Sequence, residues 1–407
     1  MRQILLLSII TITLFACENA PKKVITNDNQ VKNFIYPKNA TPIVYIGYIF
    51  IQGKADNVKG NFLLDLGTDN LHFDSLFFSE NIFDYKNIKN IKLWGIGNSF
   101  QRATLIKDTV NFQFNKNNYK TSNVLINNLK PIGGDFVDGL IGIDYFKQGV
   151  LEINYHNKYI IIYQSIDSVD VSDYKLVSIK KIENYFCMQM EVKINDSVTI
   201  KGNFIIDTGM PFSALTNYVA QKNNLDKKVE RKVRYYTKYG GIGGESSGFD
   251  FIADSLQISN FHLKNVNLSF SVDKSGILAG GEYLGIIGNN ILERFDIIID
   301  FKKSNLYLKP NENFYKPFIS NRLGFFYIDR GKTMGGWIVT GLSEKSEAEK
   351  KGLKIDDKII SVNGIPIEKI PFETQEDYFK KIDKVKLLVK SAGITKIIEF
   401  KLEQLLK

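Results

Sequence analysis

The chain has 407 residues, of which 44% are hydrophobic and 13% aromatic. This composition excludes an intrinsically disordered protein, and the length is sufficient for two or three domains. The formal net charge of +9 comes from 53 Lys and Arg against 44 Asp and Glu. Because the basic residues form no dense block, we expect no nucleic-acid partner.

The N-terminus has the pattern of a secretory signal. Arg2 precedes an apolar segment, residues 4–16, that is too short to span a bilayer as a helix. The segment ends in Leu14-Phe15-Ala16-Cys17, which resembles the lipobox of bacterial lipoproteins. That resemblance implies cleavage before Cys17 and lipid attachment to its thiol. We therefore predict a signal peptide over 1–17 and a polar tether over 18–40. The protein would then be anchored by lipid to a membrane of the bacterial cell envelope, expected to be the outer membrane, facing the periplasm or the exterior.

The second cysteine, Cys187, has no thiol partner once Cys17 is acylated. Its neighbours Tyr185, Phe186 and Met188 are apolar rather than electropositive. This setting predicts a small buried hydrophobe and no disulfide in the mature chain.

The chain repeats itself. Residues 60–67 read GNFLLDLG and residues 202–209 read GNFIIDTG, which places Asp65 opposite Asp207 at an offset of 142 (207 minus 65). Gly-Leu-Ile-Gly at 139–142 matches Gly-Ile-Ile-Gly at 285–288, and the glycine-rich stretch 94–97 matches 240–243. Three matches in the same order predict duplicated domains, which we place at 41–168 and 169–312.

Each half has the patterns of β-strands, such as 151–155 and 296–300, while helical patterns are short, as at 217–223. Taken alone, Asp207 after an apolar strand favours a strand that ends at the surface in an Asx turn, because three residues make a weak motif. Its repetition at Asp65 favours a functional acid in both halves. The fold class that we predict is mainly β.

The ordered set of apolar strand, D-x-G, glycine-rich hairpin and apolar-apolar-Gly resembles an aspartic peptidase lobe of the retropepsin type. The two halves together resemble a single-chain, bilobal counterpart of the retropepsin dimer over residues 41 to 310. This resemblance implies two tandem β-barrel lobes. It also implies a monomer that forms its active site within one chain and cuts a polypeptide substrate.

The resemblance further implies a catalytic pair, Asp65 and Asp207. Two carboxyl groups so close share one proton, so that one acts as general base on a water while the other polarises the scissile carbonyl. Gly67 and Gly209 would permit the turns by tolerating positive φ and close backbone approach, and Thr68 and Thr208 would support the loops. The segments 140–142 and 286–288 would pack behind them.

The glycine-rich hairpins would be flaps that cover a bound peptide. The expected flap residues are Trp94, Gly95 and Gly97 in the first half, and Tyr239, Gly241 and Gly243 in the second.

The sequence departs from the family at the residue after each Asp, usually Thr, and at the residue after each Gly, often Ser, Thr or Ala. The first half has Leu66 and Thr68, and the second has Thr208 and Met210. Leu66 removes half of the expected hydrogen bonds between the loops, at a net cost of about 0.5 to 1.5 kcal/mol. A slow enzyme, or a degenerate pair of lobes that only binds peptides, remains an alternative.

Other chemistries have weaker signals. His72, His156 and His262 are scattered without metal-ligand spacing, so we predict no metal. There is no G-x-S-x-G nucleophile motif and no phosphate-binding loop, and the aspartic mechanism requires no cofactor.

The C-terminal region, 318–407, strongly resembles a PDZ domain, a small α+β fold, through the stretch 346–364. By this resemblance, Leu323, Gly324 and Phe325 form the carboxylate-binding loop, where backbone N–H groups hold a peptide C-terminus and the peptide adds as a strand to the sheet edge. An ordinary strand entry is the alternative at this loop. The domain would recruit or dock peptide C-termini.

Two functions therefore remain open. The first is a lipid-anchored aspartic endopeptidase, favoured by the retention of both Asp65 and Asp207. The second is a non-catalytic envelope protein that binds peptides, favoured by Leu66 and Met210.

Overall fold

The computed structural model describes residues 34–81 and 83–406. The expected signal peptide, the lipidation site at Cys17 and most of the expected tether lie outside these residues. Residues 34–38 form a unit separate from 39–407, and in it the rings of Phe34 and Tyr36 meet edge to face. Among the described residues, no helix has the length and apolar character needed to cross a membrane.

The described residues from 39 onward are mainly β, as the sequence predicts. The first half contains a ten-stranded sheet. Its strands are β2 (Val44–Tyr45), β3 (Ile49–Ala55), β4 (Val58–Leu64), β5 (Leu71–Asp74), β6 (Ile88–Trp94), β7 (Phe100–Ile106), β8 (Val110–Phe114), β9 (Asn117–Thr121), β10 (Val124–Asn127) and β11 (Gly139–Ile141).

The second half repeats this arrangement. Its strands are β15 (Tyr185–Asn195), β16 (Val198–Ile206), β17 (Ala214–Leu215), β18 (Lys232–Gly241), β19 (Gly244–Ile258), β20 (Phe261–Ser271) and β21 (Gly285–Ile287). Pairing closes a ring in the order β15-β16-β21-β17-β20-β19 and back to β15. The first half has the corresponding order β3-β4-β11-β5-β10-β7, with β8 and β9 as separate strands where the second half has the long β19 and β20.

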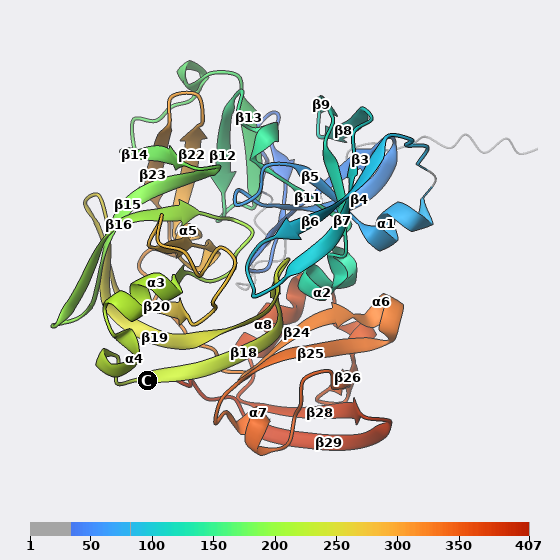
Figure 1. The fold of residues 1–407 in the computed structure, drawn as a ribbon, viewed down its shortest axis with the longest axis vertical. Helices are drawn as coiled ribbons and strands as arrows, with labels where there is room; N and C mark the ends of the chain where they lie inside the picture. The colour runs from blue at the N-terminus through green and yellow to red at the C-terminus, as the bar shows by residue number, and fades with distance from the viewer. Residues whose placement is uncertain (1–33, 82, 407) are drawn as a thin grey trace, which may run out of the picture. The chain divides into compact units, whose positions relative to one another are not determined.

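A central antiparallel sheet joins the halves. Its order is β1-β13-β12-β22-β23-β14. These strands are β1 (Thr41–Pro42), β12 (Val150–Asn154), β13 (Tyr159–Tyr163), β14 (Lys175–Ile182), β22 (Phe295–Asp300) and β23 (Asn305–Pro310). The strand patterns at 151–155 and 296–300 fall on β12 and β22, which pair with each other across the two halves (Figure 1).

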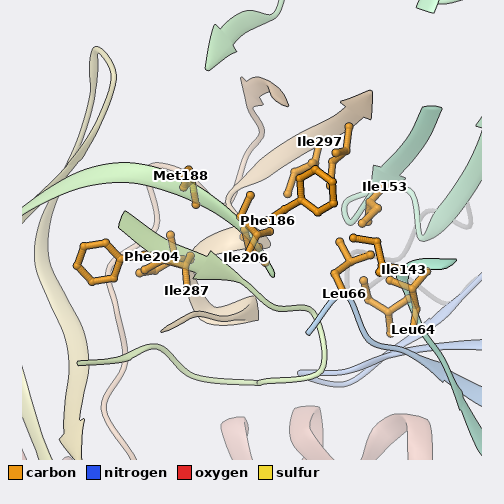
Figure 2. Close-up of a cluster of buried hydrophobic side chains, with 14 of the residues drawn as sticks. Leu64, Leu66, Ile143, Ile153, Phe186, Met188, Phe204, Ile206, Ile287 and Ile297 are labelled. Atoms are coloured by element: carbon orange, nitrogen blue, oxygen red, sulfur yellow. The ribbon is translucent and has the colours of Figure 1, made fainter. Parts of the chain in front are cut away.

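One hydrophobic core runs through both halves. It includes Leu66 from the first half and Phe186 and Ile206 from the second (Figure 2). Because β4 and β16 both contribute side chains to this shared core, the loops that follow them start from the same packed base.

The C-terminal strands and the helices complete the fold. The C-terminal strands are β24 (Phe325–Arg330), β25 (Gly336–Ser343), β26 (Lys358–Val362), β27 (Ile365–Pro366), β28 (Lys384–Ser391) and β29 (Ile394–Lys401). The helices are α1 (Ser75–Glu80), α2 (Lys130–Gly133), α3 (Asn217–Lys222), α4 (Leu225–Lys228), α5 (Asn289–Leu292), α6 (Gly331–Met334), α7 (Glu347–Lys350) and α8 (Gln375–Lys380). The 3-10 turns are η1 (Gly134–Phe136), η2 (Ile143–Tyr145), η3 (Ile166–Ser168), η4 (Ile367–Lys369) and η5 (Phe372–Thr374).

The C-terminal region has its own core, centred on Phe325 and Trp337, and it is also attached to the second half. Strand β25 pairs antiparallel with β18, with Tyr236 opposite Leu342 (Figure 1). The sheet of the C-terminal region therefore continues the sheet that carries the second glycine-rich hairpin.

Candidate active site

The two D-x-G turns are built in the same way. Asp65 follows β4 and Asp207 follows β16, and each strand pairs in parallel with a short Gly-x-x strand, β11 or β21. The Asp65 N–H donates to Ile141 O and the Asp207 N–H to Ile287 O, both at 3.0 Å. The prediction that segments 140–142 and 286–288 pack behind the loops is confirmed, because these strands hold the backbone of both acids.

Each carboxylate is also fixed by its own turn. Gly67 N–H donates to Asp65 Oδ1 at 2.8 Å, and Gly209 N–H donates to Asp207 Oδ1 at 2.7 Å. Each carboxylate therefore accepts a backbone hydrogen bond, which favours its charged form.

The structure brings Asp65 and Asp207 together across the two halves. A Cβ placed on Gly67 would lie 2.6 Å from Asp207 Cγ, and one on Gly209 would lie 2.4 Å from Asp65 Cγ. Each glycine is thus required because the opposite carboxyl group occupies the space of a side chain. The other reason expected from the sequence is wrong, since neither glycine is among the described residues with positive φ.

The pKa values of both carboxyl groups are raised. Burial raises the pKa of Asp65, and burial together with the negative charge of Asp65 raises the pKa of Asp207 well above the usual aspartate range. A hydrogen bond between the carboxyl groups lowers the pKa of Asp65 and raises that of Asp207. Both acids therefore have raised pKa values, and the ionisation of each affects that of the other.

Thr208 ties the two loops together from one side. Its hydroxyl donates to Leu64 O at 2.8 Å and accepts from the Leu66 N–H at 3.1 Å. The side chain of Leu66 cannot make the equivalent hydrogen bonds to the second loop. It is 3% exposed and packs in the shared core. Met210, 2% exposed, is likewise a core residue. The departures from the family therefore exchange one hydroxyl cross-link for apolar packing.

The two glycine-rich hairpins meet at their tips. In the first, β6–β7, Ile96 O accepts from the Gly243 N–H of the second, β18–β19, at 2.8 Å. The Ser99 N–H donates back to Gly243 O at 2.8 Å. A Cβ on Gly97 would lie 2.4 Å from Gly243 C, so this contact admits no side chain.

The other expected flap residues do not take part in these hydrogen bonds between the tips. Gly95 and Gly241 each approach the isoleucine at the opposite tip, Ile242 or Ile96. Trp94 is 59% exposed and packs on Phe100 of its own hairpin, and Tyr239 is half-buried beside Lys238.

Sequence reasoning missed Asn289, which braces the second loop. Its side-chain amide donates to Thr208 O at 2.8 Å and to Gly47 O at 2.7 Å, and its carbonyl accepts from Tyr155 OH at 2.8 Å. The corresponding residue of the first half is Ile143 (289 minus 146), so the signal was a polar residue where the repeat has an apolar one.

His72, to which the sequence assigned no role, supports the first loop. It lies on β5, 2% exposed, with Nε2 3.2 Å from Thr68 Oγ1 and Nδ1 2.9 Å from Asn127 Oδ1. Asn127 donates in turn to Gln101 Oε1, on the first flap strand, at 3.0 Å. A polar chain therefore connects the loop of Asp65 to a flap.

The expected carboxylate-binding loop already has an internal acceptor. The N–H groups of Leu323 and Gly324 donate to Asn321 Oδ1 at 2.9 and 3.2 Å, and Gly324 has φ of 72°. Phe325 pairs with Leu342 and is buried in the core, as a strand entry requires. Among the described residues, no group of three or more His, Cys, Asp or Glu is placed to hold a metal. The prediction for Cys187 is confirmed, because it is a free and buried cysteine.

Comparison with protein-family models gives two matches. Residues 190–291 match the aspartyl protease family model, and residues 316–390 match the PDZ domain model. The first range contains Asp207, whereas Asp65 lies outside it, so the likeness of the first half rests on the repeat and on the shared geometry. A search of curated proteins gives no match. The chain thus contains a retropepsin-like aspartyl protease domain at 190–291, followed by a PDZ domain at 316–390.

Proposed function

We propose that the protein is an aspartic endopeptidase that hydrolyses extended polypeptides with Asp65 and Asp207. The observation that carries the proposal is the mutual approach of the two carboxyl groups, each against the glycine of the opposite turn. Charged Asp65 takes a proton from a water molecule, and protonated Asp207 donates a hydrogen bond to the scissile carbonyl as the tetrahedral intermediate forms. Both acids and both flaps come from one chain, so a monomer would be sufficient.

The pH dependence follows from the pKa shifts. The pair works with one proton, so activity increases as pH falls through the pKa of Asp207 and decreases again as pH falls through the pKa of Asp65. Because both pKa values are raised, both limbs of the profile should lie above the range of ordinary aspartates.

The test is hydrolysis of an unfolded protein by the full chain in detergent between pH 4 and 7. We expect cleavage that a statine-type inhibitor blocks and that D65N and D207N abolish. D250N is a matched control, because Asp250 is another carboxyl group with a raised pKa, about 6, and accepts from Ser269 Oγ outside the pair. If the wild-type protein cuts nothing in this range, the proposal fails.

A non-catalytic peptide-binding protein is the second candidate. One observation favours it, namely that a single hydroxyl, Thr208 Oγ1, links the two loops. Peptide binding with no cleavage, unchanged in D207N, would select this candidate.

For the remaining parts of the chain, we propose that the PDZ domain recruits or docks peptide C-termini and that Cys17 carries a lipid anchor in the bacterial envelope. A peptide carboxylate at Leu323 and Gly324 would take the place of the Asn321 side chain. Fluorescence polarisation with a library of C-terminal peptides tests the first proposal, since the full chain should bind some of them and lose binding when they are amidated. Mass spectrometry of the N-terminal peptide, from protein isolated in the membrane fraction, tests whether Cys17 carries a lipid.

A further inference from the structure

Two apolar clusters flank the acid pair, one in each half, and the repeat relates them. In the first cluster, Leu63 of β4 pairs with Leu140 of β11. In the second, Ile205 of β16 pairs with Ile286 of β21. Leu63 and Ile205 each precede a member of the pair by two residues, so the clusters adjoin the carboxyl groups on opposite sides.

The flap tips cross over to the opposite cluster. Ile242, from the second flap, packs against the first cluster, and Ile96, from the first flap, packs against the second. A polypeptide between the flaps and the acids would therefore meet one cluster on each side of the scissile bond.

A tyrosine in each cluster lies within the electrostatic influence of the acids. Burial raises the pKa of Tyr48 in the first cluster, and the nearby carboxyl groups of Asp207 and Asp65 raise it further. Burial, with Asp207 and smaller effects of Asp69, Glu183 and Asp65, raises the pKa of Tyr185 in the second cluster to about 12. Tyr48 and Tyr185 therefore mark the side of each cluster that lies near the acid pair.

The symmetry is broken by the PDZ domain. Phe372, in η5, packs against the first cluster, with its ring stacked 4.3 Å from Phe136 and set edge-on to Phe50 at 5.7 Å. The rings of Phe50 and Tyr48 are 6.3 Å apart. Among the described residues, the second cluster has no member from the PDZ region. Phe372 and Phe136 are both half-buried, unlike Phe50, which is buried.

Polar contacts lie close in the chain to both stacked rings. Asp135, next to Phe136, accepts from Arg330 Nε at 2.9 Å and from the Thr333 N–H at 2.8 Å. Gln375, at the start of α8, donates to Asp329 Oδ2 at 2.5 Å. A buried glycine, Gly134, sits so close to β24 that a Cβ would lie 2.4 Å from Asp329 O. The ring is therefore held by a packed junction.

We propose that Phe372 is a specificity-determining residue of the peptidase: the PDZ domain supplies one wall of the subsite that receives the substrate side chain next to the first cluster. This inference rests on the proposed endopeptidase function. The stacked Phe372 and Phe136 rings select a compact apolar side chain on that side of the scissile bond, by apolar contact and by limiting its size. The other side, which faces the second cluster, is independent of the PDZ domain.

The test is a profile of cleavage sites. Wild-type, F372A and F372L proteins digest one mixture of peptides from a denatured proteome, and mass spectrometry identifies the bonds cut. I365A is the control, because Ile365 is a 37% exposed PDZ residue outside the cluster. We expect F372A to shift kcat/KM towards larger side chains on one side of the scissile bond by about tenfold or more, with F372L intermediate. The preference on the other side and the I365A profile should not change.

A merely structural role predicts a different result. The activity of F372A would then decrease by a similar factor at every cleavage site, and the ranking of sites would stay the same. That result would overturn the inference about Phe372 but not the proposed endopeptidase function. If F372A does not fold, as judged by its melting transition, the F372L profile decides between these two results. A wild-type protein with no activity would instead defeat the endopeptidase proposal, and this inference with it.

Discussion

His72 should be a neutral histidine whose burial makes the folded state sensitive to acid. Burial lowers its pKa from 6.5 to about 4 in the folded protein. The hydrogen bonds agree with this state. Because Asn127 donates to Gln101, its Oδ1 accepts from Nδ1–H, and Nε2 is left to accept from Thr68. A proton on Nε2 would remove that acceptor.

The sign and size of the effect follow by linkage. Between pH 6.5 and about pH 4 the unfolded chain binds a proton that the folded chain does not, so the free energy of unfolding decreases as pH falls through this window. Each pKa unit corresponds to about 1.4 kcal/mol, so lowering the pKa of His72 from 6.5 to about 4 gives a loss of about 3 kcal/mol. Below about pH 4 both states are protonated and the loss is complete.

The assay compares wild-type protein with H72Q, which keeps a polar side chain but does not titrate. Urea unfolding followed by circular dichroism from pH 7 to pH 4 should show that wild-type stability falls about 3 kcal/mol further than that of H72Q. All other titrating groups are common to both proteins and cancel in the difference. NMR titration of the imidazole gives the pKa directly. Parallel stability curves, or a pKa of His72 near 6.5, would refute the reasoning.

Three further predictions concern the loops and the PDZ junction. T208V keeps the shape of Thr208 but loses both buried bonds, so urea unfolding should show a loss of about 2 kcal/mol, with lower activity, whereas T199V on the exposed face of β16 should change neither. G209A places a Cβ 2.4 Å from Asp65 Cγ, so kcat should fall by about 100-fold or more, and unchanged kinetics would contradict the close approach of the turns. D135A removes the acceptor of Arg330 and Thr333, so hydrogen exchange at 329–333 should become faster, which equal exchange rates would disprove.

Much of the site could be predicted because the sequence contains an internal repeat, so that its two halves can be compared with each other. A short D-x-G motif after an apolar strand is ambiguous, since a surface Asx turn has the same pattern. Its second copy, together with matched Gly-x-x-Gly strands and glycine-rich tips, specifies two equal units that meet at an axis. The structure follows this pattern down to single bonds, as the equal 3.0 Å contacts behind Asp65 and Asp207 show.

What the sequence could not predict lies where the two halves differ. Asn289 stands where the first half has the apolar Ile143. Thr208 forms hydrogen bonds to the first loop, whereas Leu66, at the equivalent position of that loop, has no hydroxyl. A repeat identifies such positions as mismatches, but it does not say which mismatch is a brace and which is core packing. That depends on the atoms across the interface, because a hydrogen bond requires its partner within about 3 Å.

The PDZ contacts are the extreme case, because they have no counterpart in the repeat. Phe372 joins only the first cluster, and β25 extends only the sheet of the second flap, so one domain breaks the symmetry of both halves at once. The β18–β25 pairing is made by main-chain groups, which any sequence supplies, and therefore leaves no mark in composition or spacing. A pattern of residues can predict that a PDZ domain is present, whereas the surfaces that it contacts are set by packing between domains, and those contacts decide whether it acts as a separate binding module or as part of the peptidase site.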